Sequence, residues 1–181
     1  MKINNVGLEI IKHFEGLELE AYPDPGSPLG QACKAKKIPM RSYTRLGGWN
    51  RLDGAPWTIG YGHTLQVKPG MKITNEQAEV FLKQDVSASE RGVLHWVKVP
   101  INPNQFSALV CFCYNVGVYE FRTSTLLQRV NALRFTEAAD EFNRWIYAND
   151  IQLPGLIRRR KSERALFLTP HYVLQNDIPG E

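Results

Sequence analysis

Cysteine is scarce in this sequence, and its spacing argues against both a disulfide framework and a zinc site. The 181 residues include only Cys33, Cys111 and Cys113. An odd count does not suggest paired bridges, and residues two positions apart on a helix point to different sides of it. No Cys-x-x-Cys pair or Cys/His cluster occurs. We therefore expect reduced thiols, as in a protein made in a cytoplasm, with neither a metal nor a cofactor.

Long apolar runs are missing as well. The longest, residues 109–114, is far shorter than the roughly 18 residues that indicate a transmembrane helix. The first segment, MKINNVGLEIIKHFEG, has Lys2 but no continuous apolar stretch and no small-residue cleavage site, so we do not expect a signal peptide. We expect no stable membrane insertion. A target beyond the inner membrane would require another protein to let this one out.

Charge of either sign is present, with a mild positive excess. The net charge is +4, with 43% apolar and 22% charged residues, a balance typical of a folded chain of one domain. The excess favours polyanionic partners, such as nucleic acid or an anionic cell wall, and it fits simple solubility equally well. We rank a nucleic-acid-binding function last, because it would rest only on this charge and on the basic run Arg158–Lys161.

Helical patterns dominate outside one middle stretch. Apolar residues recur at helical spacing from Ile3 to Phe14, which predicts a helix ending near Gly16. Capping-box pairs at positions 74/77 and 102/105 predict helices that run to about His95 and Gly117. Further helices are expected over 124–132, 136–147 and 155–168. Residues 57–63 have the composition of a strand, whereas 22–30 are rich in turn residues and 34–56 are expected to be loop or irregular hairpin.

Two carboxylates and one hydroxyl form the candidate catalytic set. Glu15 ends the apolar face of the first helix, where partial desolvation favours the protonated form that a general acid needs. Asp24 follows nine residues later in a turn, and Thr58 lies in the predicted strand. A pair of carboxyls is the minimum equipment for glycoside hydrolysis, since one protonates the leaving group and the other aligns water. Taken singly, each residue also has an ordinary structural interpretation.

Several motifs in fixed order carry a family resemblance. They are Phe14-Glu15-Gly16-Leu17, then Ala21-Tyr22-Pro23-Asp24, then Trp57-Thr58-Ile59-Gly60-Tyr61-Gly62-His63. Further pieces follow at 104–109, 114–117, 121–127, 145 and 155–163. Together they resemble the phage-type lysozymes of glycoside hydrolase family 24, over residues 5–168.

The resemblance implies a fold and a reaction. The fold is α+β and lysozyme-like, with a small β-rich lobe, a larger mostly helical lobe and a cleft between them. Residues 1–181 would form one domain, with the β-rich lobe at 22–67 and the helical lobe at 1–20 and 68–168. The implied reaction is hydrolysis of the β-1,4 bond between N-acetylmuramic acid and N-acetylglucosamine. Glu15 would be the acid, and Asp24 and Thr58 would hold the attacking water. Such a reaction would invert the sugar, which requires carboxyl groups about 6.5–9.5 Å apart.

One stretch departs from the compact relatives, which have only a few residues between the Asp and the Thr. Here Pro25–Trp57 form a basic insertion of 33 residues, expected to enlarge the β-rich lobe. The insertion leaves Asp53 as an alternative second carboxylate, because it lies near Thr58 in the sequence. We prefer Asp24 for its spacing from Glu15 and its Tyr-x-Asp context.

Other residues are candidates for substrate binding or for structure. We expect Trp57, Tyr61 and Asn115 to contact the sugar, although Asn115 is equally well placed to cap a helix end. His63 is expected to make a structural hydrogen bond to a carboxylate. The run Arg158–Lys161, near Glu163, is expected to be a solvated or ion-paired helix face, and the resemblance implies that it holds the lobe together.

The implied partner is bacterial peptidoglycan, cut by a monomer during lysis of a host cell. Synthesis would take place in the host cytoplasm, and a holin would permeabilise the membrane so that the enzyme reaches the wall from the periplasm. A lytic transglycosylase that uses Glu15 alone is the alternative, and the second carboxylate with Thr58 favours the hydrolase. A non-catalytic wall-binding module is less consistent with three intact site residues.

Overall fold

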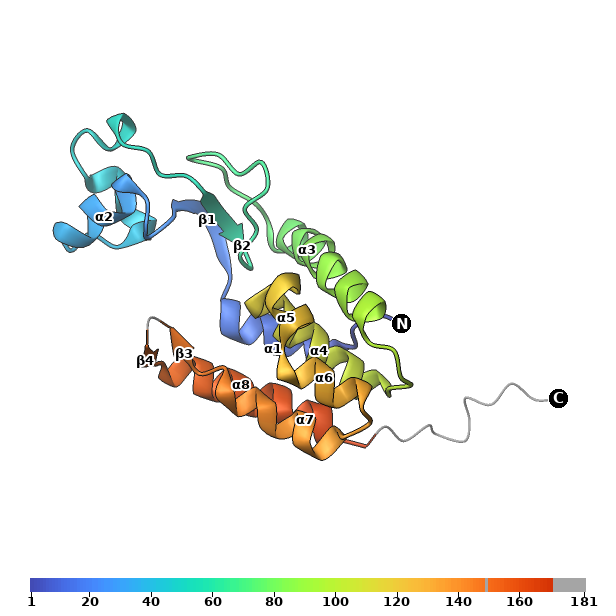
Figure 1. Cartoon of the computed structure of the whole chain (residues 1–181). Coiled ribbons are helices and arrows are strands. Elements are labelled where there is room, and N and C mark those ends of the chain that lie inside the picture. Colours follow the sequence, from blue (N-terminus) through green and yellow to red (C-terminus); the bar gives the residue numbers. More distant parts are fainter. Residues whose placement is uncertain (149, 171–181) are drawn as a thin grey trace. The chain divides into compact units, whose positions relative to one another are not determined.

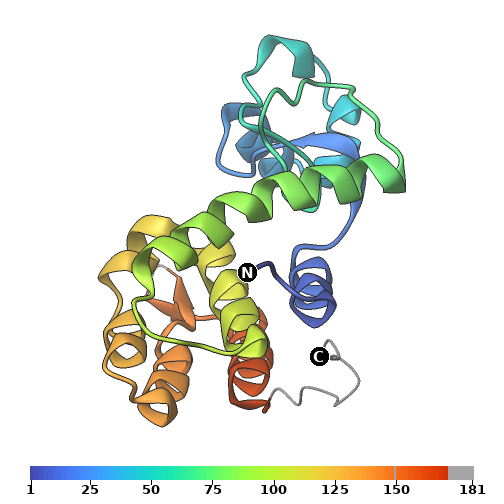
Figure 2. The same ribbon diagram turned by 90° about the vertical axis from the view of Figure 1, so that its right-hand side faces the viewer.

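The computed structural model describes residues 1–148 and 150–170, drawn in colour in Figure 1. By internal contacts the chain forms two compact units. The sheet unit is Glu15–Asp85, and the helical unit is residues 1–14 with the chain from Val86 onward. One boundary falls at the last residue of α1 (Asn5–Glu15) and the other within α3 (Asn75–Trp96), which Figure 2 shows as one continuous helix. The expected single domain, with lobes at 22–67 and at 1–20 and 68–168, stays a prediction.

A short two-stranded sheet forms the centre of the sheet unit. Strand β1 (Glu18–Pro23) pairs antiparallel with β2 (Trp57–Gly60), and Tyr22 lies opposite Thr58. Ala21, Trp57 and Ile59 are buried, whereas Tyr22 and Thr58 are half-buried. Because side chains alternate along a strand, one face of the sheet covers the core and the other presents Tyr22 and Thr58.

The insertion contains short helices, so the expected hairpin over 34–56 is wrong, whereas the expected loop is present only in the segments between these helices. It contains α2 (Pro28–Ala35) and two 3₁₀ turns, η1 (Met40–Arg45) and η2 (Trp49–Arg51). The Ser27 side chain caps α2 by accepting a hydrogen bond from the Gly30 N–H, and Pro28 suits the first helical position. Turns of this length are too short to leave a helical period in the sequence, which explains why the pattern gave no helix signal.

The insertion shares a core with the sheet. Leu29, Cys33 and Tyr43 are buried together with Trp57 and Ile59. The ring of Tyr43 meets that of Trp57 edge-on, with centroids 5.0 Å apart. A folded insertion of this kind fixes the backbone between β1 and β2, instead of leaving it as a free surface loop.

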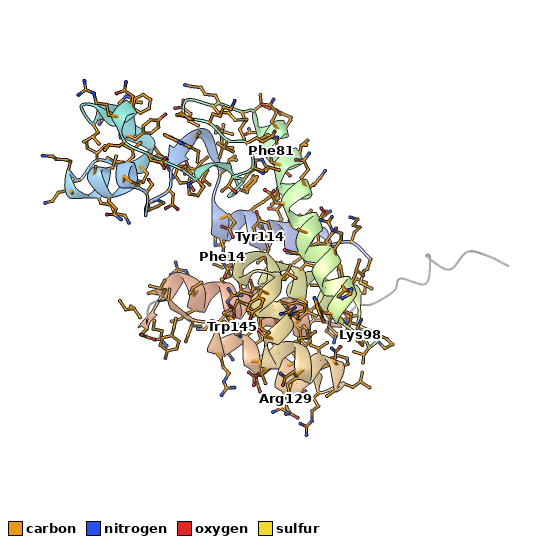
Figure 3. The ribbon with its side chains drawn as sticks, turned by 45° about the horizontal axis from the view of Figure 1, so that its top comes forward. Phe14, Phe81, Lys98, Tyr114, Arg129 and Trp145 are labelled. Carbon is orange, nitrogen blue, oxygen red and sulfur yellow. The ribbon has the colours of Figure 1, made fainter. Side chains whose placement is uncertain are left out.

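The predicted hydrogen bond from His63 to a carboxylate is confirmed within the sheet unit. His63 is buried, and its Nδ1 lies 2.9 Å from Asp85 Oδ2. Its ring also stacks on Phe81, which is labelled on α3 in Figure 3, at a centroid distance of 4.3 Å. These contacts tie the end of the sheet segment to the first half of α3, a structural function.

The helical unit is built around α4 (Pro103–Val116), buried from Phe106 to Cys113. The predicted capping box of Asn102 and Gln105 is present, and Gly117 ends the helix as expected. The other elements are α5 (Val118–Thr123), α6 (Thr125–Asn131), α7 (Phe135–Glu141), η3 (Phe142–Arg144), β3 (Tyr147–Ala148), β4 (Ile151–Gln152) and α8 (Pro154–Leu168). The sequence patterns did not indicate α5 or the β3–β4 hairpin. The presence of both helices and antiparallel strands confirms the α+β class.

Arg159 and Arg160, the two central residues of the basic run, form a buried ion-pair cluster on α8, whereas Arg158 and Lys161 are exposed. Arg159 and Arg160 both pair with Glu163, whose side chain is 0% exposed. Burial raises the pKa of Glu163, and the two guanidinium groups oppose that shift. Arg160 Nε also donates a hydrogen bond to the backbone carbonyl of Trp145, at 3.2 Å. Trp145 is labelled among the helices of this unit in Figure 3. The expected ion pairing is therefore confirmed for Arg159 and Arg160, and these pairs are internal to the unit, whereas the outer two residues of the run lie at the surface.

No helix in residues 1–148 and 150–170 combines the length and the apolar content that crossing a bilayer would take.

Candidate active site

Glu15 lines a pocket in the sheet unit. It is the last residue of α1, and Gly16, with φ +72°, supplies the left-handed backbone that ends the helix and leads into β1. The Glu15 side chain is half-buried. The pocket has a volume of about 310 Å³ and is lined by Glu15, Glu18, Tyr22, Met40 and Arg41. A carboxyl group in this position can reach a ligand in the pocket.

Tyr22 connects this pocket to Thr58. A side-chain hydrogen bond joins the two residues across the paired strands. Burial raises the pKa of the Tyr22 phenol, and the negative charges of Glu18 and Glu15 raise it further. The phenol therefore stays neutral near neutral pH and keeps its proton for hydrogen bonding. The arrangement places Thr58 one hydrogen bond away from a residue that lines the Glu15 pocket.

Hydrogen bonds fix the backbone of Asp24 at both its N–H and its carbonyl group. Its N–H donates to the carbonyls of Gly54 and Pro56, at 3.0 and 3.1 Å, where β2 begins. Its own carbonyl accepts from Ser27, whose hydroxyl lies 2.7 Å away. A Cβ on Gly30 would lie 2.1 Å from that carbonyl, so only glycine permits α2 to approach so closely. The insertion thus positions Asp24 beside the strand that carries Thr58.

Asp24 and Asp53 make the same local hydrogen bond. Asp24 Oδ1 accepts from the Gly26 N–H at 2.7 Å, and Asp53 Oδ1 accepts from the Ala55 N–H at 2.9 Å. Asp24 is half-buried, whereas Asp53 is exposed. Within the described part of the chain, Oδ2 of Asp24 has no hydrogen-bond partner, which leaves it available to water. The choice of Asp24 over Asp53 remains a prediction.

The three residues expected at the sugar lie in different settings. Trp57 is 8% exposed and belongs to the core, so its placement is structural, and any contact with the sugar stays a prediction. Tyr61 is half-buried, and its hydroxyl lies 3.5 Å from Glu79 Oε1. Asn115 belongs to the helical unit, where its Oδ1 accepts a hydrogen bond from Arg160. Glu15, Asp24, Thr58, Trp57 and Tyr61 all lie in the sheet unit.

Two lining residues were missed by sequence reasoning. Glu18 on β1 and Arg41 on η1 form an ion pair at the pocket wall. They are separated by 23 positions, and Arg41 lies in the stretch whose fold the sequence pattern did not reveal. The basic composition of the insertion was the only signal, and it did not single out Arg41. Among the residues that the structure describes, no group of three or more His, Cys, Asp or Glu side chains could hold a metal ion.

Comparison with known proteins identifies the family of this chain. A sequence model of the Phage lysozyme family matches residues 12–163. An endolysin of Acyrthosiphon pisum secondary endosymbiont phage 1 is 36% identical over 171 residues, covering 92% of this chain and 98% of that protein. An endolysin of Bacillus phage B103 is 39% identical over 170 residues, 93% of this chain, and the chain spans 55% of that relative's length.

A solved structure supports the same assignment. The muramidase domain of SpmX from Asticaccaulis excentricus matches with a TM-score of 0.74 and 38% identity, covering 93% of this chain and 99% of that one. The predicted lysozyme-like fold class is thereby confirmed. The chain belongs to the phage lysozyme family, because the family match extends over most of its length.

Proposed function

We propose that this chain is an endolysin that hydrolyses the β-1,4 bond between N-acetylmuramic acid and N-acetylglucosamine in bacterial peptidoglycan. The observation that carries the proposal is the position of Glu15 in the wall of a pocket that Glu18 and Tyr22 of β1 also line, since β1 pairs with the strand that holds Thr58 and is followed directly by Asp24. The relatives are named endolysins and a solved neighbour is named a muramidase domain, which supports the same substrate.

The chemistry assigns one task to each group. Glu15 donates its proton to the glycosidic oxygen, so that the bond to the anomeric carbon breaks and the leaving sugar departs as an alcohol. Asp24 accepts a proton from a water molecule that Thr58 helps to hold, and the oxygen of that water bonds to the anomeric carbon. The product is an ordinary reducing sugar, of inverted configuration if water attacks the far face.

The proposed biological outcome is lysis of a host cell by a monomeric enzyme. The chain would be made in the host cytoplasm and would act on the wall in the periplasm after a holin has permeabilised the membrane. These statements extend what the names of the relatives indicate, since endolysins are proteins that lyse cells from within.

Replacement of the proposed acid tests the assignment directly. Glu15→Gln keeps the size of the side chain and removes its proton, so we expect peptidoglycan cleavage to fall by at least about 10²–10⁴-fold, the usual contribution of a general acid. The matched control is Glu9→Gln on the same helix, where the carboxylate is exposed and pairs with Lys12. Equal rates of cleavage by both variants would remove Glu15 from its proposed role.

A further inference from the structure

Arg41 brings a positive charge from the insertion to the wall of the Glu15 pocket. It is the second residue of η1, which packs against β1 and α2. Met40 and Arg41 form the insertion's part of the pocket lining, and Glu15, Glu18 and Tyr22 form the rest. Arg41 is the only cation among these five residues. A relative with a short connection between the Asp and the Thr has no chain that could supply this side chain.

Glu18 pairs with the guanidinium group of Arg41 but occupies only part of its hydrogen-bonding capacity. The two side chains form an ion pair, yet the Arg41 side chain is 73% exposed while that of Glu18 is 18% exposed. A guanidinium has five N–H donors in a fixed fork, and one carboxylate engages two of them at most. Arg41 therefore retains donors that face solvent at the pocket, in the geometry that suits a second carboxylate.

The rest of the insertion adds positive charge around Arg41. Residues 25–57 contain six cations and one acid, a net charge of +5, so the remainder of the chain carries a net −1. The other five cations are all exposed, and none has an ion-pair partner within residues 1–148 and 150–170: Lys34, Lys36, Lys37, Arg45 and Arg51. A concentration of one sign raises the local density of anionic ligands.

We propose that Arg41 is a specificity residue that binds a carboxylate of the peptide stem on N-acetylmuramic acid. This inference rests on the proposed function, because it concerns a substrate bound in the Glu15 pocket. The stem is joined by an amide to the lactyl group of the sugar beside the bond to be cut, and it carries free carboxylates farther from the ring, whereas the stem-free glycan keeps only the lactyl carboxylate close to the ring. Anchoring the stem would hold the strand in register with Glu15, so stem-bearing glycan would be cut faster than stem-free glycan.

The test compares two substrates, native glycan strands and the same strands stripped of their stems. Strand cleavage is followed by chromatography of chain length, which detects cleavage whatever the chemical nature of the new ends. We expect Arg41→Met to lower the ratio of kcat/KM for stem-bearing over stem-free strands by about tenfold, the value of one charge-assisted hydrogen bond at a partly exposed site. Arg41→Lys should retain part of the preference, because it keeps the charge and loses the fork.

Arg45→Met is the matched control, since Arg45 lies on the same 3₁₀ turn and is exposed but does not line the pocket. It should leave the ratio unchanged within about twofold. A ratio that Arg41→Met does not change, or changes no more than Arg45→Met, would overturn the inference. An equal loss of kcat/KM on both substrates would also overturn the inference, because it would mean that Arg41 supports the structure of the site and does not recognise the stem.

Failure of the proposed function is distinguishable from failure of this inference. If the wild-type protein cleaves neither substrate, the muramidase proposal fails while a binding measurement still tests Arg41. Titration calorimetry of a disaccharide-peptide against Glu15→Gln protein, with and without Arg41→Met, should show about tenfold weaker binding in the double variant. Equal affinities would contradict a stem contact at Arg41.

Discussion

Removal of the Glu163 carboxylate should destabilise the helical unit strongly. Arg159 Nε donates to Glu163 Oε1 at 3.1 Å, and Arg160 Nη1 donates to Oε2. The side chains of the three residues are 4%, 1% and 0% exposed, so water cannot replace the carboxylate. Glu163→Gln keeps the shape but replaces one of the two acceptor oxygens with an N–H₂ group that faces a guanidinium, and it removes the negative charge that balances both arginines. Breaking a buried ion pair from one side costs about 3–5 kcal/mol.

That loss is a large share of the 5–15 kcal/mol by which a native domain is usually stable. For a chain of this length it corresponds to a fall in Tm of about 6–20 °C. The control is Glu137→Gln, which removes an exposed carboxylate that pairs with Arg129 and Arg134. Pairs of that kind contribute about 0–1 kcal/mol, so its Tm should fall by less than about 4 °C.

Thermal unfolding followed by circular dichroism measures both variants. The cluster also reaches the active-site helix, because the Arg159 guanidinium lies 5.8 Å from the centre of the Phe14 ring, one residue before Glu15. We therefore expect Glu163→Gln to lose activity at temperatures where its native state is still populated. A Tm within about 4 °C of the wild type would refute the view that Glu163 compensates two buried charges.

Two further predictions concern the second carboxylate and a buried thiol. Asp24→Asn should lower the cleavage rate by about 10²–10⁴-fold, whereas Asp53→Asn should change it by less than about threefold. The two variants are matched in local structure, because each aspartate accepts a hydrogen bond from the backbone N–H two residues further on. The reverse ranking in a cleavage assay would assign the role of second carboxylate to Asp53. Burial raises the pKa of Cys113 to about 11, above the roughly 8.5 of an unfolded thiol. Its contribution to stability is thus complete below about pH 8.5 and is lost as pH rises to about 11. Urea unfolding between pH 9 and 11 measures how the free energy of unfolding decreases as pH rises. Cys113→Ala should make this decrease less steep by up to about 1.4 kcal/mol per pH unit. An unchanged slope of free energy against pH would contradict a buried neutral thiol.

Local signals in the sequence predicted the long helices well. Capping residues such as Asn102 and Gln105 act within one turn, so the start of α4 could be predicted from adjacent positions. The motifs around Glu15 and Thr58 are likewise short, and the structure connects both residues through Tyr22. Structural features that depend only on neighbouring residues could therefore be predicted from the sequence.

The insertion and the pocket wall depend on contacts between distant residues. One-turn helices such as η1 have no period to detect, and their stability comes from packing, as when Tyr43 meets Trp57. The same packing buries Trp57, whose position next to Thr58 in the sequence suggested a contact with the sugar. Arg41 reaches the pocket through the packing of η1 on β1 and through its ion pair with Glu18, both contacts between residues far apart in the sequence.

Mass analysis of the muropeptides released from purified peptidoglycan tests the central claim most directly. Our account predicts products that end in an ordinary reducing N-acetylmuramic acid, because Asp24 and Thr58 deliver water to the anomeric carbon. Products lighter by one water molecule, which carry a 1,6-anhydro sugar, would mean that no water enters the reaction. That result would make the protein a lytic transglycosylase and would leave Glu15 as the only catalytic assignment.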